Sequence, residues 1–158
     1  MRVKTRELKH RSKVALRRAE EEPLLYARIL GLEARDTISL SEKTHAGFSY
    51  RTVIRFQNAA SLSTRQIAEV LLVPLRTMAR RREQGRLRPD ESDRLLRATR
   101  VFAKALALFE GNREAAKQWL TTPKVALRGR TPFDLARTDV GAREVETLVD
   151  RVEHGVFS

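Results

Sequence analysis

The chain has 158 residues, no cysteine and three widely separated histidines, so we expect neither a disulfide framework nor a metal site. No apolar stretch approaches the length of a membrane span and no secretion signal is visible, which predicts a soluble cytoplasmic protein. The net charge is +12. Residues 1–90 hold 20 Lys and Arg against 10 Asp and Glu, whereas residues 91–158 hold 12 against 10. This split favours nucleic acid as the partner of the first half. A solvated basic surface without a partner is the alternative.

Helical periodicity runs through most of the chain. Residues 1–20 are predicted to form a basic arm or a polar helix, and Pro23 begins a short apolar helix behind three glutamates. Residues 38–48 are expected to form a loop. Ser49 is a candidate cap for the helix that follows, and Gly85 fits the end of a later helix.

The second half is predicted to contain longer helices. One is expected to begin at Asp90 or Ser92, because apolar residues recur at three- and four-residue steps up to Phe109. Thr131-Pro132 is typical of a helix start. A last helix is expected over residues 142–155. No strand pattern competes, so the predicted fold class is all-α.

Residues 63–82 have the layout of a helix-turn-helix. Ala68 is small enough for the two helices to approach closely, and Val73 fills the turn. Leu72 departs from the pattern, because this turn usually carries a glycine and a leucine resists a positive φ. A helical hairpin with a basic exposed face is the alternative interpretation.

The side chains of this motif are expected to divide between base edges and phosphates. Arg76, Thr77 and Arg80 share the outer face of the second helix and are assigned to base edges. Leu75 departs from the pattern, because it is apolar at a position that often contacts DNA, although it could meet a thymine methyl group. The residues assigned to phosphates are Arg65, Gln66, Arg81, Arg82 and Arg86. Operator DNA is therefore an expected partner, bound by a homodimer whose recognition helices lie roughly 34 Å apart.

A series of residues in the second half occurs in the order typical of a known family. The series comprises residues 90–97 and 109–116, Trp119-Leu120, Pro123, Ala126-Leu127, Gly129, Thr131-Pro132, Asp134-Leu135, Thr138, Gly141, Val145, Leu148 and Gly155-Val156-Phe157. It resembles the Xre/MbcA/ParS-type antitoxins, and the helix-turn-helix upstream belongs to the same layout. Lys124 stands where an asparagine is common, and Phe133 and Ala136 replace usual leucines. These departures change packing without removing a motif.

The resemblance implies an antitoxin that pairs with a RES-domain toxin, an enzyme that consumes NAD⁺, and that represses its own operon. It also implies that the C-terminal helix and tail plug the active site of the toxin. Burial of one apolar side chain such as Phe157 in a cleft is worth roughly 1.5–3 kcal/mol. The candidate toxin-binding residues are Arg151, His154, Gly155, Val156, Phe157 and Ser158. In the alternative, Phe157 folds back on its own domain.

Three regions are therefore expected along the chain. Residues 1–46 form a basic arm and a short helix, residues 47–90 a DNA-binding domain, and residues 91–158 a toxin-binding domain. The alternative function is a repressor whose C-terminal half serves only dimerisation. The sequence shows no phosphate-binding glycine loop, no catalytic triad pattern and no metal-spaced ligands. We therefore expect no catalytic residue, no cofactor and no enzyme activity.

Overall fold

The computed structural model describes residues 25–155. The basic arm and three of the candidate toxin-binding residues, Val156, Phe157 and Ser158, lie outside this range. Residues 25–29 are helical. The helices that follow are α2 (Thr37–Ala46), α3 (Arg51–Ala60), α4 (Thr64–Leu71), α5 (Leu75–Gln84), α6 (Pro89–Leu108), α7 (Arg113–Thr121), the 3₁₀ turn η1 (Val125–Leu127), α8 (Pro132–Leu135) and α9 (Asp139–Glu153).

The all-α prediction is confirmed for the part of the chain that the structure describes. Its only extended pairings are two isolated bridges, which join Ser49 to Arg86 and Lys124 to Arg130. Among residues 25–155, no helix is both long enough and apolar enough to span a membrane.

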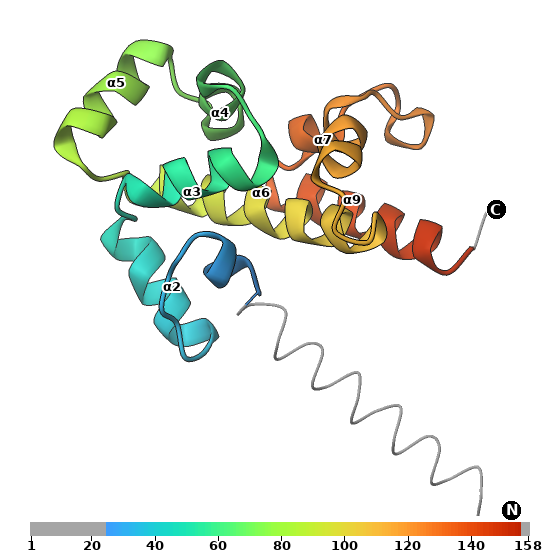
Figure 1. The fold of residues 1–158 in the computed structure, drawn as a ribbon, viewed down its shortest axis with the longest axis horizontal. Helices are drawn as coiled ribbons and strands as arrows, with labels where there is room; N and C mark the ends of the chain where they lie inside the picture. The colour runs from blue at the N-terminus through green and yellow to red at the C-terminus, as the bar shows by residue number, and fades with distance from the viewer. Residues whose placement is uncertain (1–24, 156–158) are drawn as a thin grey trace, which may run out of the picture.

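Helix α6 is the axis of the fold, with α4 and α5 near one end and α7 and α9 near the other (Figure 1). Its 20 residues span about 30 Å. It packs against α2, α3, α4, α7, α8 and α9. Pro89 occupies its first position, where the missing N–H costs nothing. The expected domain boundary at residue 90 falls in this first turn, so both halves of the chain share α6.

One hydrophobic core runs through both halves. Phe56 of α3 lies edge-on to Phe102 of α6, with ring centroids 5.9 Å apart, and to Phe133 of α8 at 6.5 Å. Edge-to-face pairs of this kind add about 0.5–1.5 kcal/mol each beyond the burial of the rings. Because Phe56 contacts α6 and α8, helix α3 of the first half is packed directly onto helices of the second half.

The expectation of a loop over residues 38–48 is wrong, because most of this stretch is α2. Helix α2 has little apolar periodicity, and Leu40 and Thr44 are its buried residues. Its start is set instead by a reciprocal cap. The Asp36 carboxylate accepts the Ser39 N–H at 2.7 Å, and the Ser39 hydroxyl accepts the Asp36 N–H at 3.2 Å.

The last helix begins three residues earlier than expected, at Asp139. The Thr138 hydroxyl caps it by accepting the N–H of Gly141 at 3.1 Å. At Gly141 the backbone passes so close to the α8 end that a Cβ atom would lie 2.0 Å from the Leu135 carbonyl oxygen. Glycine is therefore required here by close packing.

Candidate functional site

The turn between α4 and α5 has the geometry of a helix-turn-helix. Helix α4 starts with a capping box, in which the Ser63 hydroxyl accepts the Gln66 N–H at 3.2 Å and Gln66 Oε1 accepts the Ser63 N–H at 2.9 Å. Ala68 is buried, and its carbonyl accepts the N–H of Val73 at 3.0 Å. The chain thereby closes α4 and turns directly into α5.

Leu72 adopts the left-handed conformation at which this turn usually carries a glycine, with φ at 56°. This conformation costs a leucine about 1–2 kcal/mol. Arg94 of α6 stabilises the end of α4 by donating to the Leu71 carbonyl at 2.9 Å. The Leu72 side chain is 48% exposed. The expected conflict at this position is therefore present, and the packing around the turn overcomes it.

Helix α5 divides its side chains between the core and solvent. Met78 and Arg81 are its buried residues. Most of the residues assigned to DNA are exposed, namely Arg65, Leu75, Arg76, Arg80, Arg82 and Arg86, and Thr77 is partly exposed. Gln66 has committed its side-chain oxygen to the α4 cap, so its amide NH₂ group is the part that remains for a phosphate.

Arg81 does not fit the phosphate contact assigned to it. Its side chain is buried, and its guanidinium makes three hydrogen bonds to the Glu91 carboxylate and one to Gln84 at 3.0 Å. Hydrogen bonding to Glu91 raises the pKa of Arg81 above its ordinary value. Arg81 lies three residues after Met78, on the same helix face. That spacing was the signal for burial.

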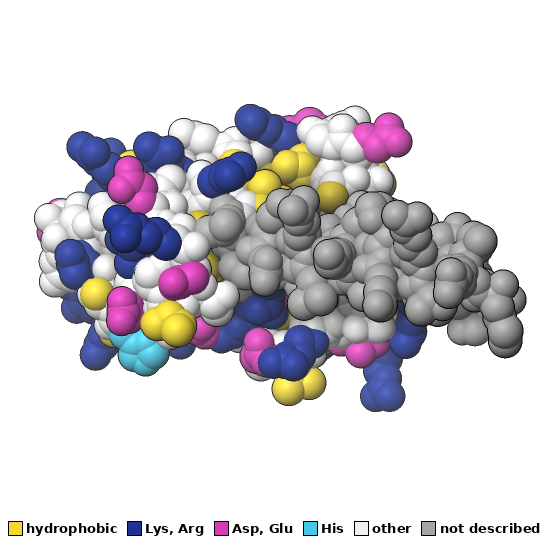
Figure 2. Space-filling model, turned by 90° about the horizontal axis from the view of Figure 1, so that it is seen from below, with side chains coloured by type: hydrophobic (Ala, Val, Ile, Leu, Met, Phe, Trp, Pro, Cys, Tyr) yellow, Lys and Arg dark blue, Asp and Glu magenta, His cyan; other side chains and the backbone are white. Residues whose placement is uncertain are grey.

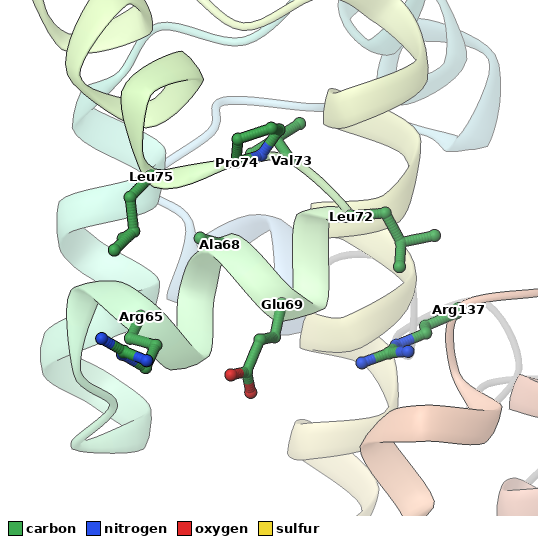
Figure 3. Close-up of a pocket in the computed structure, with 8 residues that line it drawn as sticks. All are labelled: Arg65, Ala68, Glu69, Leu72, Val73, Pro74, Leu75 and Arg137. Carbon is green, nitrogen blue, oxygen red and sulfur yellow. The ribbon is translucent and has the colours of Figure 1, made fainter.

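A shallow groove of about 400 Å³ lies along the outer side of the motif (Figure 3). The first turn of α4 contributes Arg65, the turn contributes Leu72, and the start of α5 contributes Leu75. Glu69 and Arg137 also line it, although nothing in the sequence pointed to either residue. Arg137 follows α8 and lies more than sixty residues after Leu75 in the sequence. Figure 3 shows Arg65 and Arg137 on either side of the Glu69 carboxylate.

The basic side chains are distributed unevenly over the surface of the protein. In the view of Figure 2, the Lys and Arg side chains of the described residues are interspersed with Asp and Glu and form no single basic patch. On α5 the balance differs, because its exposed residues include three arginines and one glutamate. The helix-turn-helix is therefore a better candidate for a nucleic-acid surface than the face shown in Figure 2.

The second candidate surface is the C-terminal end of α9. Arg151, His154 and Gly155 are exposed there, and Gly155 has φ at 65°. Helix α9 ends at Glu153, and the chain leaves it at the outer edge of the molecule (Figure 1). The candidate residues beyond Gly155 lie outside the described range.

Ion pairs fix α9 on α6. Arg100 pairs with Glu146 and with Asp139, the latter at 3.6 Å, and Lys104 pairs with Asp150 at 3.1 Å. A hydrogen bond from Arg143, together with the charges of Arg143 and Arg100, lowers the pKa of Asp139 from its ordinary 3.8. These ion pairs hold α9 along α6, so α6 sets the direction in which the C-terminal end of α9 points.

Residues 25–155 contain no cluster of three or more His, Asp or Glu side chains that would hold a metal ion. Comparison with known proteins gives two family matches in chain order. Residues 39–100 match the antitoxin Xre-like helix-turn-helix domain. Residues 104–155 match the antitoxin Xre/MbcA/ParS C-terminal toxin-binding domain.

The chain is also similar to curated proteins named Antitoxin Xre. The protein from Yersinia enterocolitica is 38% identical over 132 residues, which cover 83% of this chain and 89% of that protein. The chain belongs to the Xre/MbcA/ParS family of antitoxins. Antitoxin Xre from Photorhabdus laumondii is 30% identical over the same shares of both chains, and that from Pseudomonas putida is 39% identical over 85 residues. The family resemblance noted in the sequence is thus confirmed, and a toxin-binding domain implies a toxin as partner.

Proposed function

We propose that this antitoxin neutralises a RES-type, NAD-consuming toxin by inserting its C-terminal end into the toxin's active site, and that it represses its own operon through DNA binding. The observation that supports this most directly is the placement of two candidate surfaces on one packed body. The helix-turn-helix and the end of α9 lie toward opposite ends of α6 (Figure 1). One chain can therefore hold DNA and toxin without either surface covering the other.

The toxin-binding role rests on the end of α9. Exposed Arg151 and His154 occupy the last turn, and Gly155 has open space around its Cα, with nothing within 4 Å of an added Cβ. The residues that follow, Val156 and Phe157, are apolar and are the proposed tip. An apolar tip of this kind can bury its side chains in the active-site cleft of the toxin.

The repressor role rests on α5 and the turn before it. Arg76 and Arg80 are exposed on the recognition helix, where side chains of this motif reach base edges. Arg65 and Arg82 are exposed beside them and are suited to phosphates. A homodimer is proposed to place two such helices roughly 34 Å apart on an inverted repeat. Both roles place the protein in the cytoplasm.

Co-expression with a RES-type enzyme tests the toxin half, with cellular NAD⁺ as the readout. We expect NAD⁺ to fall when the toxin is expressed alone, and to be restored when the chain is co-expressed and co-purifies with it. A binding titration on the upstream DNA tests the repressor half. Operator binding with intact repression but no effect on NAD⁺ would instead favour a repressor whose C-terminal half serves only dimerisation.

A further inference from the structure

The groove beside the helix-turn-helix is built from both halves of the chain. Arg65 and Leu75, which are both assigned to DNA, line it together with Arg137 from the segment between α8 and α9. In a helix-turn-helix complex the start of the first helix meets the backbone, and the start of the second reaches base edges. Figure 3 shows Arg65 and Leu75 toward one side of the groove and Arg137 toward the other, so a duplex that also extends along α4 reaches Arg137.

The backbone of Arg137 is held in place by α6. Arg97 donates from Nη1 to the Arg137 carbonyl at 2.7 Å, and the Arg137 guanidinium forms an ion pair with the Asp134 carboxylate at 3.1 Å. Its side chain is 37% exposed. A guanidinium has five N–H donors, so one contact with Asp134 leaves donors for a phosphate.

We propose that Arg137 of the toxin-binding half contacts a phosphate of bound DNA and extends the DNA-binding surface beyond the helix-turn-helix. This inference rests on the proposed DNA binding. Arg65 and Arg137 stand on either side of Glu69 in Figure 3, so two cations face the strand with one acid between them. The Glu69 carboxylate repels the phosphates of the strand at the position where the two arginines attract them. Removing Arg137 and neutralising Glu69 should therefore change affinity in opposite directions.

Fluorescence titrations of the full chain test this, using the duplex upstream of its gene and a random duplex of equal length over a salt series. Arg137→Ala should weaken binding to both duplexes about three- to tenfold, because one exposed, charge-assisted contact is lost. It should also flatten the slope of log affinity against log salt by about 0.9. Glu69→Gln should strengthen binding to both.

Arg143→Ala is the matched control. Arg143 also pairs with an acid in its own helix, Asp139 at 2.8 Å, but it is exposed on α9 and does not line the groove. We expect its affinity and salt slope to equal those of the wild type. Thermal melting of each variant checks that the fold is intact.

The outcomes separate the inference from the proposed function. If wild-type protein shows no binding to either duplex, the proposed repressor role fails. If the wild type binds and Arg137→Ala behaves like Arg143→Ala, the inference on Arg137 is overturned and the repressor role stands. Loss of toxin neutralisation by Arg137→Ala with DNA binding unchanged would also overturn it, and would assign the residue to the toxin.

Discussion

The carboxylate of Glu91 and the guanidinium of Arg81 form a buried ion pair that joins the recognition helix to α6. Arg81 donates from Nε to both Glu91 oxygens, at 3.0 and 2.8 Å, and from Nη2 to Oε1 at 2.9 Å. Glu91 also accepts the Arg88 N–H at 2.9 Å, which caps the start of α6. The orientation of α5 therefore depends on this one carboxylate.

Glu91→Gln should destabilise the protein by about 3–5 kcal/mol, because it leaves the Arg81 charge buried without its partner. Chemical denaturation followed by circular dichroism measures this. Arg82→Gln, on an exposed neighbour of Arg81, should change the stability by less than about 0.5 kcal/mol. Replacing both partners by methionine should cost less than Glu91→Gln alone, because no unpaired charge remains. If the double methionine variant and Glu91→Gln lose the same free energy of unfolding, the ion pair itself stabilises the fold.

Arg76→Ala should weaken operator binding by about 1–3 kcal/mol and relax the preference for one base pair, because Arg76 is exposed at the start of α5. Arg82→Ala should instead weaken operator and random DNA equally and flatten the salt slope by about 0.9. Competition titrations with single-base operator variants distinguish the two effects. If the two substitutions give the same specificity profile, the division between base and phosphate contacts is wrong.

Leu72→Gly should raise the free energy of unfolding by up to about 1 kcal/mol. Relief of the left-handed leucine is worth about 1–2 kcal/mol, and the greater entropy of glycine in the unfolded chain offsets about half of that. Leu72→Ala keeps the strain and is the control. Urea unfolding curves measure both variants, and equal midpoints for leucine and glycine would contradict strain at this turn.

Deletion of Gly155 to Ser158 should leave the fold intact and abolish toxin neutralisation. The last residue of α9 is Glu153, so the deletion leaves the whole of α9 in place. Thermal melting and NAD⁺ recovery on co-expression are the two measurements. Val140→Ser, at an exposed apolar position in the first turn of α9, should affect neither. A deletion variant that still restores NAD⁺ would refute insertion of the tail.

The cap of α2 should make a small contribution to stability that depends on pH. Hydrogen bonds from Ser39 lower the pKa of Asp36 below its ordinary 3.8. A lowered pKa means that this contribution is fully present above pH 3.8 and is lost as the pH falls through the folded value. Carboxyl NMR titration measures the pKa. Asp36→Asn should remove this pH-dependent contribution to stability. A pKa of Asp36 equal to its ordinary value would contradict the cap.

Helix boundaries were predictable where a proline or a glycine marks them. Thr131 caps α8 and accepts the Asp134 N–H at 3.1 Å, as the Thr-Pro pair indicated. Gly85 ends α5 with φ at 71°. Helix α2 was missed because its signal lies in the cap rather than in apolar spacing, and Arg81 was misassigned because arginine is usually exposed.

The order of residues thus determined an all-α chain with a helix-turn-helix followed by the pattern of a toxin-binding domain, since caps, periodicity and motif spacing are local properties. Three outcomes depended on tertiary structure. It turned Arg81 inward against Glu91, forced Leu72 into a left-handed turn, and brought Arg137 to the rim of the groove beside α4. Each depends on contacts between residues that are remote in sequence or on the packing around them. Local spacing can indicate that a residue is buried, as for Arg81, but it does not identify the remote residue that it contacts.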